Sequence, residues 1–284
     1  MMKNAVIAVS FLALWACSSA PKRPAEVFSL RNQAETQLQL VNRAADQGDY
    51  ERALVLMEES MRVAVKADDP ALLARNLLAR GNIYFRINRG DDAQADWDTA
   101  LAEAEAAGLQ ELAGLCRIYM IRARLLGSGG ISDGELEAVC SQLQSEIALL
   151  KKDRLSAALG YTVLGLAEKE RRNWAGAEAA LQKALALHDK DRYLEDAAYD
   201  CYLIASVRSV SGDYNGALEA LDQAVVYDRR AENTYGLAAD WRARGDVLKK
   251  AGRTDEAASA YRRAAEIFRS LELEKEAADC DARI

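Results

Sequence analysis

A small residue recurs along the chain, and the residues four and seven positions after it are large and small in turn. The small residue is alanine, at Ala53, Ala93, Ala177, Ala217 and Ala257. Four residues later come Met57, Trp97, Leu181, Leu221 and Tyr261, and seven residues later come Ser60, Ala100, Ala184, Ala224 and Ala264. Offsets of four and seven share one face of a helix, so the pattern predicts a helix after each alanine that packs closely against a neighbour.

The spacing of these marks indicates a repeat. The position numbers of successive alanines differ by 40, 84, 40 and 40, and because 84 is twice 42, one degenerate copy is expected near Glu135. Turn segments such as Gly48-Asp49-Tyr50 and Gly212-Asp213-Tyr214 precede the marked helices. We therefore expect two antiparallel helices per repeat. The predicted ranges are 27–47/49–67, 70–88/90–107, 109–126/132–150, 153–171/173–188, 190–211/213–229 and 233–251/253–270, with a last polar-faced helix at 272–283.

The composition agrees with an all-helical chain. Only three prolines occur in 284 residues, Pro21, Pro24 and Pro70, and half of the residues are apolar. Proline is the main breaker of helix interiors, so most of the chain is free to be helical. A long heptad coiled coil is the alternative, and the turn signals, about one per 20 residues, weigh against it.

These marks, a small residue, a turn, an aromatic residue and Ala-Leu, resemble the tetratricopeptide repeat (TPR) over residues 26–284. The likeness is weaker in the first repeat and poor in the third. It implies an all-α, right-handed superhelical solenoid of about six antiparallel helix pairs plus a C-terminal capping helix, here over residues 27–284. The repeat is longer than the usual TPR length of about 34 residues, which favours lengthened helices.

The N-terminus predicts an export signal. Lys3 precedes a 12-residue apolar stretch, Ala5 to Ala16, which is too short to span a bilayer but fits a signal peptide. Leu14-Trp15-Ala16-Cys17 resembles the bacterial lipobox, although Trp15 departs from it. The resemblance implies a cleaved leader at 1–16, diacylated Cys17, a tether to residue 26, and attachment to the periplasmic side of the envelope, with the outer membrane favoured. The alternative is a plain secretory leader.

Charge and candidate chemistry argue against an enzyme. The formal charge is −7, which disfavours nonspecific binding to nucleic acid. The one histidine, His188, is expected at a helix end as a favourable cation, and one histidine cannot supply a two-histidine metal motif. The glycine-rich segment 127–134 lacks the Gly-Lys-Ser/Thr of a phosphate loop and is interpreted as an enlarged turn. We expect no cofactor and no metal.

The TPR resemblance places partner-binding residues on the first helix of each pair, which lines the concave face. The residues carried over from the contact positions of the family, or grouped with them as hot-spot types, are Arg75, Asn82, Phe85, Arg117, Arg124, Tyr199 and Tyr202. The three arginines are expected to form one basic patch. The alternative is that these side chains pack against neighbouring repeats. A chaperone-type carboxylate clamp is not expected, because Leu38, Ala79 and Ile121 stand where it needs other residues.

Four cysteines follow the leader: Cys116, Cys140, Cys201 and Cys280. Cys201 falls at a core position and is interpreted as a small buried apolar residue. Cys116 and Cys140 are expected near each other at the open end of the third helix pair, where an exported protein could pair them as a disulfide.

Three functions remain as hypotheses: two binding functions, and an enzymatic one against which the candidate chemistry argues. The first is a scaffold or adaptor for envelope proteins or peptides, which leaves homo-oligomerisation open. The second is a transporter-associated periplasmic TPR component that oligomerises and binds a small apolar ligand. A polar groove would favour the first, and a large apolar pocket would favour the second.

Overall fold

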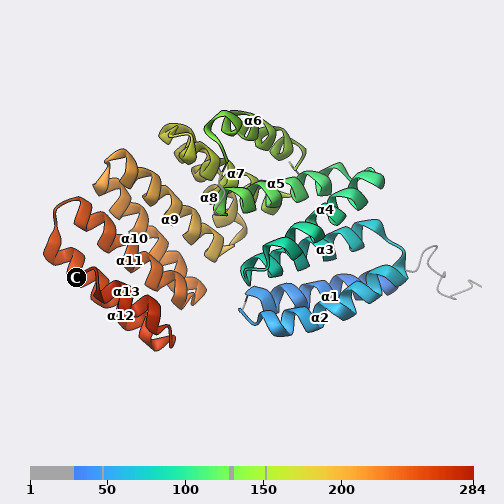
Figure 1. Ribbon diagram of the computed structural model, residues 1–284, viewed down its shortest axis with the longest axis horizontal. Helices are drawn as coiled ribbons and strands as arrows, with labels where there is room; N and C mark the ends of the chain where they lie inside the picture. Colours follow the sequence, from blue (N-terminus) through green and yellow to red (C-terminus); the bar gives the residue numbers. More distant parts are fainter. Residues whose placement is uncertain (1–28, 47, 128–130, 151) are drawn as a thin grey trace, which may run out of the picture.

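The computed structural model describes residues 29–46, 48–127, 131–150 and 152–284, so the leader, Cys17 and the tether lie outside the described residues. The described chain is helical throughout, and its helices form an arc of antiparallel pairs (Figure 1). The helices are α1 (Ser29–Asp46), α2 (Tyr50–Ala67), α3 (Pro70–Arg86), α4 (Gly90–Ala106), α5 (Gln110–Leu126), α6 (Asp133–Leu149), α7 (Arg154–Glu170), α8 (Trp174–Asp191), α9 (Leu194–Ser211), α10 (Tyr214–Ala231), α11 (Thr234–Lys250), α12 (Thr254–Ser270) and α13 (Glu274–Asp281).

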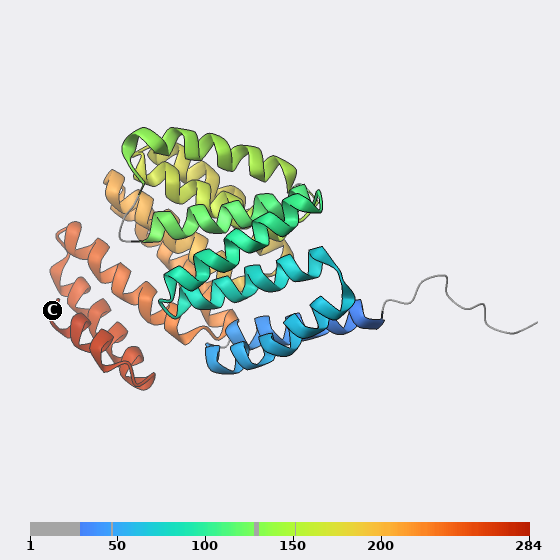
Figure 2. The same ribbon diagram turned by 45° about the vertical axis from the view of Figure 1, so that its right-hand side comes forward.

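Six helix pairs and a capping helix are therefore confirmed, with ends close to those that the sequence predicts. In Figure 1, α1–α4 form one arm of the arc, α9–α13 form the other, and α5–α8 join them. The turned view in Figure 2 shows the successive pairs stacked against each other. None of the described helices is long and apolar enough to cross a membrane.

Three of the helix pairs are held by a large side chain set against a glycine. A Cβ added to Gly81 would lie 2.5 Å from Trp97 Nε1, one added to Gly165 would lie 2.5 Å from Leu181 Cγ, and one added to Gly245 would lie 2.5 Å from Tyr261 Cε1. The three large side chains are almost fully buried. The repeat marks are thus contact points within these pairs, because only a residue without a side chain admits the facing ring or isobutyl group.

Turn chemistry sets where the second helices begin. Asp49, Asn173 and Asp213 precede α2, α8 and α10, and each side-chain oxygen accepts a hydrogen bond from a backbone N–H three residues later. Before the turn, Gly48 and Gly212 have positive φ values of 76° and 92°, a backbone conformation that glycine adopts without strain. Gly-Asp therefore ends one helix and starts the next.

The degenerate third pair carries four extra residues, and their position changes the register. Helix α3 begins at residue 70, α5 at residue 110 and α7 at residue 154, so the first interval is 40 and the second is 44. The excess lies mainly in the turn between α5 and α6, where the sequence has its glycine-rich segment. Residues of α5 are therefore equivalent to residues 40 positions earlier in α3, not 42 as an even division of the gap would give.

Buried carboxyl groups lie between the later repeats. The Asp228 side chain in α10 and the Asp240 side chain in α11 are each 2% exposed and interact directly. Asn233 donates a hydrogen bond to Asp228 Oδ1 over 2.8 Å, whereas Asp240 Oδ2 has no hydrogen-bond partner among the described residues. Burial raises the pKa of Asp228 to about 6 and that of Asp240 to about 8, with the neighbouring Asp228 adding to the rise at Asp240.

Candidate functional site

A groove on the inner side of the arc, called here the central groove, collects residues that are far apart in the sequence. It has a volume of about 520 Å³ and receives side chains from α1, α3, α5, α7, α8 and α9. Because α1 and α9 both contribute, the arc curls enough for its two arms to share one wall. Its polar and charged lining residues are Asn42, Arg75, Asn82, Arg86, Glu111, Tyr119, Asp153, Ser156, His188, Tyr193 and Asp196.

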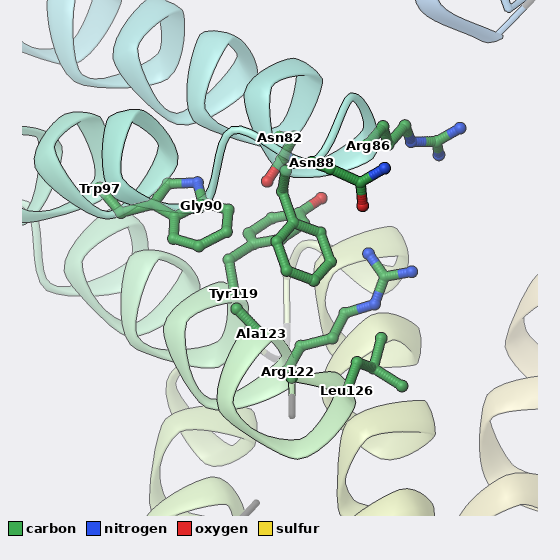
Figure 3. A pocket seen from close by; sticks show the side chains of 11 residues that line it. Asn82, Arg86, Asn88, Gly90, Trp97, Tyr119, Arg122, Ala123 and Leu126 are labelled. Atoms are coloured by element: carbon green, nitrogen blue, oxygen red, sulfur yellow. The ribbon is translucent and has the colours of Figure 1, made fainter. Parts of the chain in front are cut away.

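A second hollow, called here the edge pocket, opens beside the central groove where α3, α4 and α5 meet. It has a volume of about 600 Å³ and shares Asn82, Arg86 and Tyr119 with the groove. Phe85 and Trp97 give it an aromatic wall, with ring centroids 5.8 Å apart. Figure 3 shows the polar ends of Arg86, Asn88 and Arg122 on the side away from Trp97, with Tyr119 between them. The described residues contribute guanidinium and amide groups to this lining but no carboxylate.

Tyr119 lies between the two hollows and contributes to both. Burial raises the pKa of the Tyr119 hydroxyl, and the Arg122 charge and the Asn82 amide oppose the rise. Arg122 of α5 also acts on Tyr199 of α9, where it opposes the burial that raises the pKa of that hydroxyl. Arg122 therefore faces the interior of the arc between its two arms.

Three of the predicted binding residues line these hollows. Arg75 lies in the central groove, Asn82 lies in both hollows, and Phe85 lies in the edge pocket. Arg75 is exposed and forms no ion pair with the described part of the chain. The structure thus places these three side chains of α3 at the two hollows, and their role in binding a partner stays a prediction.

The predicted basic patch of Arg75, Arg117 and Arg124 is wrong. Arg117 is bound between repeats, to Glu105 of α4 over 2.8 Å and to the buried Glu146 of α6 over 3.2 Å. Arg124 pairs with Glu135 of α6 over 3.4 Å. Neither arginine lines the central groove or the edge pocket. The two side chains serve contacts between helices, which is the packing alternative that the sequence left open.

The register explains this error and identifies the residue that the sequence analysis missed. An offset of 42 relates Arg75 and Asn82 to Arg117 and Arg124, but the helices are offset by 40. The equivalents in α5 are therefore Leu115 and Arg122, and both line the hollows. Two residues rotate a side chain by about 200° around a helix, which is enough to move it from the groove to the outside. Placing the four extra residues in the glycine-rich turn would have revealed Arg122.

Tyr199 and Tyr202 lie together on α9. Their rings stack, with centroids 6.3 Å apart and an interplanar angle of 10°. Tyr199 is 37% exposed and Tyr202 is half-buried. Neither lines the two hollows, although both stand on the first helix of their pair, as predicted. They offer an aromatic surface next to the groove.

His188 lies at a helix end, as the sequence predicts, but it is buried and its ring contacts a carboxyl group of the next helix. It lies in the last turn of α8, is 4% exposed, and its Nδ1 is 2.7 Å from Oδ2 of Asp200, which is fully buried. Thr162 donates a hydrogen bond to the other oxygen of Asp200 over 2.7 Å. Burial raises the pKa of Asp200, and the interactions with His188 and Thr162 oppose the rise. The contact of α8 with α9 thus encloses a polar network beneath the groove.

The four cysteines of the described chain are buried free thiols. Cys116 packs in a core cluster with Trp97 and Ala100, whereas Cys140 packs in another with Leu143. The structure does not form the disulfide that the sequence allows between Cys116 and Cys140. Cys201 is a small buried core residue, as predicted, and burial raises its pKa to about 12. No group of three or more histidine, cysteine or acidic residues in the described part of the chain could hold a metal ion.

Comparisons with known proteins agree with the fold. The family model described as tetratricopeptide repeat matches residues 33–67, which are within the first helix pair. No curated protein sequence matches the chain. The match falls on a repeat whose marks are weaker than those of most others.

Three solved structures share the arrangement of helices. The apo form of RapI has a TM-score of 0.63 at 14% identity, covering 86% of this chain and 68% of RapI. A Rap protein complexed with competence and sporulation factor has a TM-score of 0.62 at 16% identity, covering 88% of this chain and 73% of that protein. PilW, a type IV pilus biogenesis factor, has a TM-score of 0.55 at 17% identity, covering 87% of this chain and 97% of PilW. At these identities the likeness concerns the fold.

The repeat marks, the helix pairs, the matched repeat and the similar structures lead to one assignment. The chain has the fold of a tetratricopeptide-repeat solenoid, and its first helix pair matches the model of that repeat.

Proposed function

We propose that this protein is a non-enzymatic scaffold or adaptor that binds partner proteins or peptides in its central groove. The carrying observation is the groove itself, a continuous hollow built from six helices and lined by both apolar and polar side chains. TPR proteins are generally interaction modules without catalytic activity. The Rap protein that shares the fold is complexed with competence and sporulation factor, which fits a binding role.

The lining of the groove favours a protein partner over a small apolar ligand. Arg75, Asn82 and Asp196 stand among Leu78, Leu112 and other apolar residues. An apolar ligand would leave the guanidinium, amide and carboxylate groups of this wall without partners, at a free-energy cost for each group. A polypeptide supplies backbone and side-chain groups that can pair with them. The transporter-associated alternative therefore has less support from the groove.

We also propose that the protein acts at the bacterial envelope, held by lipid on Cys17 with the outer membrane favoured. Support for this comes from the apolar stretch and the Leu14-Trp15-Ala16-Cys17 segment. Each methylene of an acyl chain that enters the bilayer contributes about 0.8 kcal/mol, so two or three chains attach a protein stably. The solenoid would then present its groove to other envelope proteins.

Site-specific photo-crosslinking in cells tests the binding site. A photoreactive phenylalanine analogue at Leu115 places the probe in the groove, and the same probe at Val226, exposed on α10, serves as the control. We expect a discrete partner adduct from position 115, its loss when Arg75 is also replaced by alanine, and none from position 226. Adducts from position 226 alone would contradict binding in the groove.

A further inference from the structure

Two arginines inside the arc lack the ion pairs that most arginines near it possess. Arg80, Arg117 and Arg154 are each bound to a carboxylate. In contrast, Arg75 in the central groove and Arg122 in the edge pocket form no ion pair with the described part of the chain. Arg122 is only half-exposed, so its charge is held in a partly desolvated position without a compensating carboxylate from the described residues.

The residues around Arg122 form a pocket. Asn82 and Asn88 line it with amide groups, and Phe85 and Tyr119 line it with aromatic rings. In Figure 3 the polar ends of Asn88 and Arg122 lie on the side of the pocket away from Trp97. A volume of about 600 Å³ accepts a large side chain together with the carboxylate of a neighbouring residue. Arg86 adds a second guanidinium to the lining.

The opposite charge nearby lies outside this pocket. Glu111, Asp153 and Asp196 line the central groove, and Asp196 adds to the rise of the Tyr119 pKa. None of the three lines the edge pocket, where the described residues contribute two arginines and no acid although the whole chain has a formal charge of −7. The edge pocket is thus a local positive site in an acidic protein, which attracts a carboxylate and repels a lysine or arginine.

The spacing of Arg75 and Arg122 sets the length of the segment that could reach both. Arg122 stands at the position in α5 that Asn82 holds in α3, and Arg75 is seven residues before Asn82 on the same helix. Seven helical residues span about 10 Å along the axis, and the separation of neighbouring helices adds about 8–10 Å at right angles, so the two arginines start about 13 Å apart. Their long side chains can converge by several ångström, which leaves a gap of about three to four residues of extended chain. The edge pocket and the central groove are joined through Asn82, Arg86 and Tyr119, so an extended chain can pass from one to the other.

From these observations we propose that the edge pocket and Arg75 together recognise an internal acidic segment of a partner protein. Two acidic residues three positions apart pair with Arg75 and Arg122, and an aromatic or large aliphatic residue beside the second one packs against Phe85 and Tyr119. Arginine forms two parallel hydrogen bonds with a carboxylate, which fixes the orientation of the segment. The proposal rests on the proposed function, since it names the chemistry of the partner in the same groove.

Fluorescence anisotropy with the full-length protein tests the proposal. The probe is a labelled, C-terminally amidated peptide with the core Glu-Gly-Phe-Glu, so that it carries no terminal carboxylate. Matched peptides have the cores Gln-Gly-Phe-Gln and Lys-Gly-Phe-Lys. We expect the glutamate peptide to bind at least tenfold more tightly than either of the others, and its affinity to fall as salt is raised.

Protein variants locate the site. Arg122→Gln and Arg75→Gln should each weaken binding of the glutamate peptide about tenfold. Arg124→Gln, on the same helix but paired with Glu135, should leave it unchanged. In NMR spectra, the indole N–H signal of Trp97, which lines the pocket, should shift on titration, and those of Trp174 and Trp241 should not.

Equal or tighter binding of the lysine peptide would overturn the inference, and so would wild-type affinity in Arg122→Gln. A glutamate peptide that fails to bind at millimolar concentration also overturns it. The proposed function is tested separately, because the photo-crosslinking from position 115 depends on no assumed sequence of the partner. A partner adduct there with no binding of the acidic peptide would leave the scaffold intact and remove only the acidic segment.

Discussion

Replacing Asp240 by asparagine should stabilise the protein, although Asp240 is buried. The Asp228 and Asp240 side chains interact between α10 and α11, and one oxygen of Asp240 lacks a partner among the described residues. A carboxyl group has a pKa of about 3.9 when unfolded, whereas burial and the neighbouring carboxyl raise the pKa of Asp240 to about 8 in the folded protein. The folded state therefore binds a proton that the unfolded state releases.

The sign and size of the effect follow from proton linkage. Because the pKa of Asp240 is raised in the folded state, its contribution to the free energy of unfolding is fully present below about pH 4. That contribution is lost progressively between about pH 4 and pH 8, because ionisation of the same carboxyl group stabilises the unfolded chain. At pH 7 the loss has an upper limit of about 4 kcal/mol, which is 1.36 kcal/mol for each of about three pH units. An asparagine at this position cannot ionise, and its amide can donate to Asp228. We expect the variant to gain about 2–3 kcal/mol at pH 7, within that limit.

Urea unfolding of wild type and Asp240→Asn at several pH values between 4 and 9 measures the difference. The advantage of the variant should be near zero at the acidic end and grow with pH. The matched control is His188→Ala, because His188 and Asp200 hold the positions one repeat before Asp228 and Asp240. This change leaves the buried Asp200 without its partner and should cost about 3–5 kcal/mol. A destabilised Asp240→Asn, or a gain that does not change with pH, would refute the reasoning.

Three further predictions concern the anchor, the register and the thiols. Cells labelled with an alkyne fatty acid should incorporate label into the wild type and not into Cys17→Ser, and equal labelling would remove the lipid anchor from the proposal. Ala217→Glu places a charge at a position with no exposed surface, between α9 and α10. It should lower the free energy of unfolding by several kcal/mol, as measured by circular dichroism in urea. An unchanged unfolding midpoint would contradict the place of Ala217 in the core. Peptide mapping without reductant should find free thiols at Cys116 and Cys140, as the structure has them, and a linked peptide would instead support the pairing expected from the sequence.

The sequence is sufficient to predict the helix pairs, because each residue of the repeat pattern makes a contact with residues close to it along the chain. Gly81 and Trp97 face each other across two antiparallel helices, and the same spacing along the chain recurs at Gly165 and Leu181. Asp49 and Asp213 fix helix starts through contacts within three residues. Short-range contacts of this kind leave a pattern in the sequence that repeats with the structure.

The lining of the central groove and the edge pocket was predicted only in part. It depends on which face of each helix turns toward the hollows, and helices without the repeat pattern do not reveal that face. The spacing of the alanines gives the total length of repeats two to four but not where the four extra residues lie. An error of two positions in the register led to Arg124, which pairs with Glu135, in place of Arg122, which lines the edge pocket. The burial of His188 depends on its contact with Asp200 in the next helix, and no local sequence pattern predicts that contact.

The central groove is formed by both arms of the arc, and this has a mechanical consequence. Its two sides belong to helices that begin at residues 29 and 194, and every helix pair between them contributes an angle to the curl. The width of the groove therefore depends on the packing angles at all the interfaces between successive helix pairs. A small adjustment at several repeats would move the arms together or apart without breaking any single contact. A segment held by both arms would oppose that motion, so occupancy and stiffness of the solenoid are linked.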